Sequence, residues 1–260
     1  MTAGAESPVR TIAFAASVAL VCSLIVSTAV YLLRPIALAY EAIDLDRAVL
    51  EAAGLLPDDA DGDDRAVVRA FLDLEARAVD LDAGAFTDAV DAAGADFRAA
   101  LDEPAKLVPI PAGLDVAGLE TRPRYAPVYL LRADRRIVRI VLPLYARGMW
   151  STIHGVIALD SDFSTIAGIA FYAHGETPGI GDRIERDDWR AQWVGRRLYD
   201  DTGELRFRLG VGAAARTPEY GVDSITGATV TTSAVGDAIT YWFSEDGYEP
   251  FLRRLREGGD

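Results

Sequence analysis

The longest uninterrupted apolar stretch of the chain, residues 12–33, contains no charged side chain. As a helix, a run of this length spans roughly 33 Å at about 1.5 Å per residue, which is enough to cross a hydrocarbon core of about 30 Å. The pattern therefore predicts one transmembrane helix at residues 12–33, preceded by an N-terminal tail at residues 1–11.

A cleaved signal peptide is the alternative interpretation, because residues 37–39 (ALA) resemble a small-residue cleavage site. The apolar run, however, exceeds the usual signal core of about 7–15 residues, and Arg34 and Pro35 interrupt the approach to that site. We therefore favour a retained membrane anchor. Its orientation is left open by charge, since Arg10 and Arg34 flank the run almost symmetrically.

Residues 34–103 follow a different pattern, in which apolar residues recur at helical spacing. The clearest examples are Val67, Val68, Phe71, Leu72 and Leu74. This spacing predicts a helical segment, with two or three helices between residues 41 and 103. The acidic run at residues 58–64 (DDADGDD) lacks the spacing and the distal glutamate of an EF-hand calcium loop, so we interpret it as a solvated loop.

From Pro127 onward the chain contains short apolar, β-branched runs separated by turn-forming residues. Such runs are typical of strands, and they lie at residues 128–132, 137–142, 153–159, 166–172 and 205–211. The sequence therefore predicts an α+β fold, in which a single N-terminal transmembrane helix is followed by an extramembranous domain. That domain, at residues 104–260, is expected to hold an antiparallel sheet with flanking helices.

Composition and charge exclude several classes of function. The 260 residues are 50% hydrophobic, so the chain can bury a sizeable core. A formal charge of −14 argues against a nucleic-acid partner. The sole cysteine, Cys22, has no partner in the chain for a disulfide, and neither phosphate-loop nor dinucleotide glycine motif occurs. We predict no catalytic residue and no metal site; the lone His174 is interpreted as structural.

Two short segments remain as candidates for chemistry. The first, residues 174–181 (HGETPGIG), follows a predicted strand. Two interpretations have equal support. The segment is either a Pro-Gly turn or a loop whose glycines let the backbone approach a planar ligand.

The second segment, residues 223–229 (DSITGAT), precedes apolar residues at helical spacing. Thr229 is therefore expected at or just before a helix N-terminus, where unpaired N–H groups favour a phosphate. The alternative is that Thr229 is only an N-cap, a common role for threonine.

The segment at residues 223–229 resembles the flavinylation motif of the covalently FMN-binding C subunit of the Na⁺-translocating NADH:quinone reductase and of related flavin subunits. In that family the final threonine of the motif carries FMN through a phosphoester. Further segments resemble the same subunit in the same order, so the resemblance extends over nearly the whole chain. These segments are residues 21–27, 33–35, 142–152 and 174–181.

The resemblance implies a covalently bound FMN on Thr229. It implies that Thr226, Gly227 and Ala228 shape the approach to the hydroxyl, while Asp223 and Ser224 fix the turn. The isoalloxazine ring would be lined by Glu176, Thr177, Gly179 and Ile180. The match excludes the neighbouring hydroxyls of Thr231, Thr232 and Ser233, although physical chemistry alone does not. Asp182 is more acidic than is usual at its position in the family.

The family implies an FMN-carrying electron-transfer subunit of a membrane-bound NADH:quinone oxidoreductase complex that exports Na⁺. The partners would be the other subunits of the complex and the bacterial inner membrane, with the soluble domain in the periplasm. A flavin transferase is also expected, because a threonine hydroxyl is a poor nucleophile without an adjacent base. Two alternatives remain: the flavin subunit of the related Rnf-type ferredoxin:NAD⁺ oxidoreductase, and an anchored binding or assembly module without cofactor.

Overall fold

The computed structural model describes residues 8–57, 60, 63–92, 97–101 and 103–259. The chain divides into two units, residues 1–44 and 45–260, which are described separately. Helix α1 (Pro8–Ala53) provides the first unit. Its segment Pro8–Arg34 is long and apolar enough to cross a membrane, and none of it is buried within the protein. This confirms an N-terminal apolar helix, whereas residues 1–7 of the expected tail lie outside the described residues.

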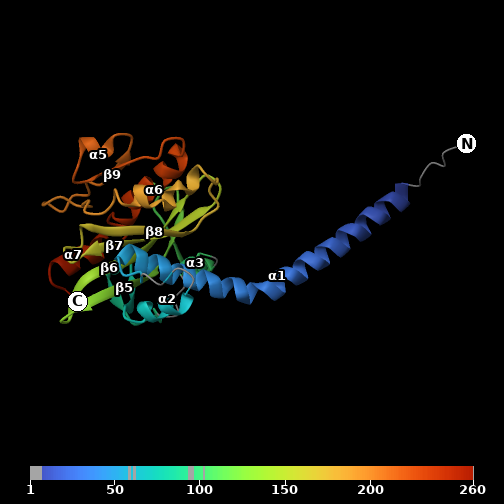
Figure 1. Cartoon of the computed structure of the whole chain (residues 1–260), viewed down its shortest axis with the longest axis horizontal. Coiled ribbons are helices and arrows are strands. Elements are labelled where there is room, and N and C mark those ends of the chain that lie inside the picture. The colour runs from blue at the N-terminus through green and yellow to red at the C-terminus, as the bar shows by residue number, and fades with distance from the viewer. Residues whose placement is uncertain (1–7, 58–59, 61–62, 93–96, 102, 260) are drawn as a thin grey trace, which may run out of the picture. The chain divides into compact units, whose positions relative to one another are not determined.

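The second unit is built on a six-stranded antiparallel sheet in the order β2-β1-β5-β6-β7-β8 (Figure 1). The α+β prediction is thereby confirmed, and the first four predicted strands lie within β5 to β8. The strands are β1 (Glu75–Asp80), β2 (Ala85–Thr87), β5 (Tyr125–Ala133), β6 (Arg136–Arg147), β7 (Thr152–Asp160) and β8 (Ile166–Ala173).

Both faces of the sheet are covered, and alternate residues of each strand point to opposite faces. On β6, Leu142 and Leu144 join a core with helices α6 (Thr229–Trp242) and α7 (Glu249–Arg256). Val141 joins a second, smaller core with the end of α1 and with α2 (Asp64–Phe71). The central strands are therefore buried on both sides.

The last turns of α1 belong to this second unit. Val49, Leu50, Ala52 and Ala53 are all buried there. A Cβ added to Gly168 of β8 would collide with the carbonyl oxygen of Ala52. Because glycine has no Cβ, the helix backbone can lie directly against the strand.

Short elements complete the fold between and after the strands. Two further sheets are small: β3 (Leu107–Pro109) pairs antiparallel with β4 (Thr121–Pro123), and β9 (Arg208–Gly210) pairs parallel with β10 (Gly221–Asp223). The predicted strand at residues 205–211 is therefore only β9, outside the main sheet. The short helices are α3 (Phe97–Ala100), η1 (Pro104–Lys106), η2 (Gly181–Glu185), α4 (Asp187–Arg190) and α5 (Ala213–Arg216).

The helical prediction for residues 41–103 holds for the end of α1, for α2 and for α3, but it is wrong for residues 75–87. These form β1 and β2, although the sequence of β1 (EARAVD) is poor in strand-favouring residues. Strand β1 pairs with β5 on one side and β2 on the other, and this tertiary pairing overrides the weak local preference. Within the acidic run, Asp58, Asp59, Asp61 and Gly62 lie outside the described residues, while Asp63 caps α2 by accepting from the backbone N–H of Arg65.

Candidate functional site

Three segments that are distant in sequence meet at one end of the sheet. Strand β6 ends at Arg147 and β7 begins at Thr152, so the turn at residues 148–151 lies at this end. The antiparallel neighbour β8 ends here too, and it leads into the loop at residues 174–181. A hydrogen bond between Glu176 and Thr231 brings the first turn of α6 to the same place.

Thr229 is the first residue of α6, and its side chain is exposed. The flanking cap position belongs to Ala228, which has no side-chain cap, so the N-cap interpretation of Thr229 is wrong. Within the described residues no hydrogen bond engages the Thr229 hydroxyl. The first N–H groups of any helix lack an intrahelical acceptor and carry the positive end of the helix dipole. An accessible hydroxyl thus lies at a site that favours an anion.

The neighbouring hydroxyls differ from Thr229 in their surroundings. Thr231 and Thr232 are both buried. Thr231 donates to Glu176 Oε2 at 2.5 Å, and Thr232 donates to the carbonyl oxygen of Ala228 at 2.7 Å. Ser233 is exposed, on the next turn of the helix. Burial and hydrogen bonding therefore disfavour two of the three competing hydroxyls.

The segment before α6 is fixed at its beginning and open at its end. The carboxylate of Asp223 accepts from the backbone N–H of Ala214 at 3.0 Å, and the N–H of Ser224 donates to Gly210 at 3.2 Å. Thr226 and Gly227 are exposed. Gly227 has a φ of +88°, a conformation that side chains rarely adopt, and nothing lies within 4 Å of the place its Cβ would take. The chain therefore turns sharply into α6 and leaves the approach to Thr229 uncovered.

The loop at residues 174–181 is a compact turn. The carbonyl oxygen of Thr177 accepts from the N–H groups of Ile180 at 3.1 Å and Gly181 at 2.9 Å. Gly179 has a φ of +75° and is exposed, as is Ile180. The predicted turn is therefore present, with an exposed backbone at Gly179, and the approach of a planar ligand to that backbone stays a prediction.

Glu176 lies in the interior of this loop. Its side chain is among the buried charged groups, with 4% exposed. Oε1 accepts from the backbone N–H of Trp150 at 3.1 Å, and Oε2 accepts from the Thr231 hydroxyl. The Glu176 carboxylate is therefore directed at protein donors, whereas Gly179 and Ile180 of the same loop are exposed.

Trp150 is a site residue that the sequence analysis did not single out. Its indole is 68% exposed, yet its position is fixed, because Nε1 donates to the Thr177 hydroxyl at 3.1 Å and the backbone N–H is held by Glu176. The only signal in the sequence was its place within residues 142–152. Met149, next to Trp150 in the chain, and Val230, next to Thr229, are also exposed apolar residues.

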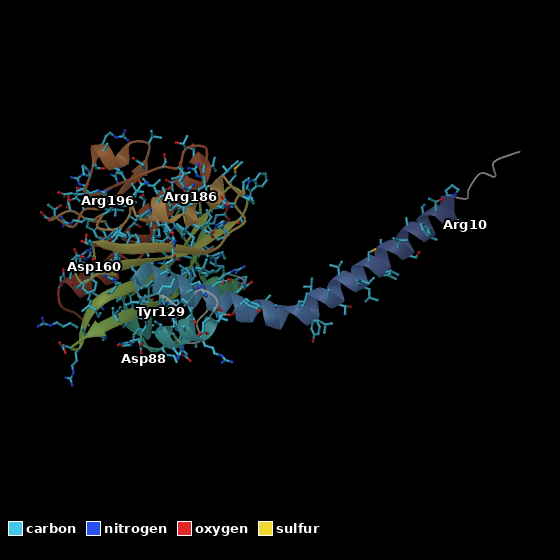
Figure 2. The ribbon with its side chains drawn as sticks, in the orientation of Figure 1. Arg10, Asp88, Tyr129, Asp160, Arg186 and Arg196 are labelled. Atoms are coloured by element: carbon cyan, nitrogen blue, oxygen red, sulfur yellow. The ribbon has the colours of Figure 1, made fainter. Side chains whose placement is uncertain are left out.

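A small polar cavity of about 190 Å³ lies beside the segment that precedes α6. Arg183, in its wall, donates to the carbonyl oxygen of Thr226 at 3.2 Å, and Arg186 is paired with Asp188 at 2.9 Å. Figure 2 places Arg186 among the segments that follow β8. The cavity is lined by Arg183, Arg186, Asp188, Trp189, Gln192, Ser224, Ile225 and Thr226.

His174 begins the loop and has two partners. Its Nδ1 accepts from the N–H of Glu176 at 3.3 Å, and its Nε2 lies 2.9 Å from Glu185 Oε1. The Glu185 carboxylate raises the pKa of His174, against the opposing effect of burial. This arrangement agrees with a structural role for the imidazole.

Comparison with known proteins gives a consistent picture. The FMN-binding domain family matches residues 148–244, a range that contains the turn, the loop and α6. The chain is 37% identical to the C subunit of the Na(+)-translocating NADH-quinone reductase of Pseudomonas aeruginosa, over 98% of this chain and 99% of that protein. It is also 37% identical to the protein of the same name from Neisseria meningitidis, over 94% and 92% of the two chains.

Solved structures agree with this assignment. The crystal structure of Shewanella oneidensis NqrC matches with a TM-score of 0.74 and 32% identity, covering 84% of this chain and 99% of that chain. The crystal structure of the C subunit from Parabacteroides distasonis, 23% identical with a TM-score of 0.65, supports the fold alone.

Proposed function

Because the chain belongs to the C-subunit family of the Na⁺-translocating NADH-quinone reductase, we propose that it is the FMN-carrying electron-transfer subunit of such a membrane-bound complex. Relatives that align over nearly the full length of the chain support this assignment, and so does the FMN-binding domain. These findings favour it over the ferredoxin:NAD⁺ alternative and over a module without cofactor. Bound FMN supplies the redox chemistry, and the protein supplies binding, orientation and electrostatics.

FMN is joined to Thr229 through a phosphoester in this proposal. The observation that carries it is the exposed Thr229 hydroxyl, free of hydrogen bonds among the described residues, at the first position of α6. The unpaired N–H groups of that turn suit a phosphate dianion. Gly227 and Ala228 leave the hydroxyl open, while Asp223 and Ser224 hold the preceding turn.

Attachment requires an activated flavin and a separate flavin transferase. The bond that forms joins Thr229 Oγ1 to phosphorus. The bond that breaks must release a good leaving group, such as AMP from a flavin dinucleotide, and the hydroxyl proton must leave. The imidazole of the loop, His174, is already engaged by Glu185. An external base is therefore needed to activate the hydroxyl.

The surroundings of Thr229 fit a flavin ring. Thr177, Gly179 and Ile180 present a partly exposed loop surface, and Trp150 presents a fixed indole beside it. Aromatic faces favour stacking with planar ring systems. The exposed apolar side chains of Ile180, Met149 and Val230 can exclude water from such a ring. Thr226, at the exposed turn, borders the same approach.

The other functions of the complex belong to partner subunits in this proposal. The segment Pro8–Arg34 contains no carboxylate, so it offers no side chain of the kind that lines cation paths. It serves as a single-pass anchor in the inner membrane, with the FMN-binding domain on the periplasmic side. A covalent link keeps the flavin bound where free FMN is scarce, because retention no longer depends on concentration.

The test is mass spectrometry of the full-length protein co-expressed with an active flavin transferase. Wild type is compared with Thr229→Ala and with the matched control Ser233→Ala, which removes the other exposed hydroxyl of the helix start. We expect an FMN adduct on the peptide containing Thr229 in the wild type and the control, and none in Thr229→Ala. An adduct that persists in Thr229→Ala, or moves with Ser233, would refute the proposed site.

A further inference from the structure

Glu176 occupies the point where the turn, the loop and α6 meet. We propose that it is a positioning residue, which fixes the turn at residues 148–151 and the loop at residues 174–181 on the first turn of α6. It thereby determines the geometry and the electrostatic environment of a flavin carried on Thr229. The second part of this inference rests on the proposed function, whereas the first concerns the protein alone.

The two carboxylate oxygens of Glu176 bind two different segments. Oε1 accepts from the backbone N–H of Trp150 in the turn, at 3.1 Å. Oε2 accepts from the hydroxyl of Thr231 in α6, at 2.5 Å. Hydrogen bonds to a carboxylate are stronger than those between neutral groups. One side chain thus joins both segments to its own loop.

The backbone closes tightly around this carboxylate. A Cβ at Gly148 would lie 2.5 Å from Glu176 Oε1, and a Cβ at Gly181 would lie 2.8 Å from Glu176 Cβ. Real Cβ atoms do not approach so closely, so any larger residue at either position would displace Glu176. Close glycine packing and hydrogen bonds to both carboxylate oxygens therefore fix the position of the Glu176 side chain.

Other hydrogen bonds connect the turn and the loop without reaching α6. The Ser151 hydroxyl accepts from the N–H of Gly175 at 2.6 Å, and Trp150 Nε1 donates to the Thr177 hydroxyl. The bond from Thr231 to Glu176 extends this network to the helix that carries Thr229. Removing it should therefore loosen the loop from the helix while the turn and the loop stay joined.

The charge of Glu176 has a second effect. Helix α6 has no acidic residue in its own first turn, so the Glu176 carboxylate supplies negative charge at the positive end of the helix. A negative charge close to the flavin disfavours the addition of an electron. Replacing Glu176 by glutamine keeps the size of the side chain and removes the charge, so it should raise the flavin midpoint potential.

The experiment uses the full-length protein in detergent. Hydrogen exchange is first measured on unflavinylated wild type, Glu176→Ala, Thr231→Val and the control Ser151→Ala. We expect exchange in the loop and in the first turn of α6 to accelerate roughly tenfold or more in the first two variants. In the control, exchange in α6 should match wild type. Thr231→Val keeps the size of the side chain, so the test survives if Glu176→Ala fails to fold.

The midpoint potential and the visible spectrum of flavinylated Glu176→Gln are measured next. A higher potential than wild type, with Thr231→Val closer to wild type, is the expected result. Wild-type exchange in both Glu176→Ala and Thr231→Val would overturn the positioning role, and an unchanged potential in Glu176→Gln would overturn the electrostatic one. If wild type carries no flavin, the proposed function fails, but the exchange measurement still decides the positioning role.

Discussion

The two ends of α6 lie in opposite surroundings and serve different purposes. At the N-terminal end, Thr229 and Val230 are exposed, and the helix has no side-chain cap. At the C-terminal end, Trp242 is fully buried against Tyr145 and Tyr248, with ring centroids 5.2 and 5.5 Å away. One helix thus secures the fold at one end and presents a reactive hydroxyl at the other, and mutations at its two ends should separate stability from attachment.

The largest effect on stability is expected from Trp242→Ala. It leaves a cavity in the core and removes the hydrogen bond from Nε1 to the carbonyl oxygen of Tyr145, so the free energy of unfolding should fall by about 3–5 kcal/mol. Truncation at the exposed end of the same helix, Val230→Ala, should cost less than about 1 kcal/mol. Urea unfolding of the full-length protein in detergent, followed by circular dichroism, measures both. Equal losses would contradict the comparison.

A smaller effect is expected from a pair of threonines in the first turn. Thr232→Val removes a buried hydroxyl that donates to Ala228 and accepts from the N–H of Ile225 at 3.3 Å. Leaving that N–H unsatisfied should cost about 1–3 kcal/mol. Thr229→Val should leave unfolding nearly unchanged and abolish flavin attachment. Unfolding curves and mass spectra of the two variants provide the check. A loss of stability in Thr229→Val, or a loss of flavin attachment in Thr232→Val alone, would refute the prediction.

The smallest effect is a pH dependence at the start of the loop. Glu185, and more weakly Glu176 and Asp182, raise the pKa of His174. A raised pKa in the folded state means that the ion pair stabilises the protein below the unfolded pKa of about 6.5, and that this contribution is lost as pH rises through the folded value. Because Glu185 is half-exposed, the contribution should be only about 0.2–1 kcal/mol.

The measurement for this pH dependence is the difference in unfolding free energy between wild type and Glu185→Gln, at pH 6 and at pH 9. We expect the difference to shrink at pH 9. A difference that is constant across this range would show that the imidazole does not titrate against Glu185.

The sequence predicted the central sheet well, because strands β5 to β8 carry dense runs of Val, Ile and Leu whose burial needs no knowledge of distant partners. It failed for β1, whose Ala, Arg and Asp residues become a strand only through pairing with β5 and β2. The local motif singled out Thr229 as the candidate attachment site. The hydrogen bonds of Glu176 and the fixed position of Trp150 could not be predicted in this way, since they join segments that are distant in sequence.

The contact between α1 and β8 has a consequence for the order of events during synthesis. Residues 45–53 leave the ribosome early, whereas Gly168 and Ala170, against which they pack, are made much later. At about 5–20 residues per second, the wait lasts on the order of ten seconds. During that time the apolar face formed by Val49, Ala52 and Ala53 lacks the strand against which it packs. A chaperone that shields this short helical face until β8 emerges would therefore act on the nascent chain before the six-stranded sheet is complete.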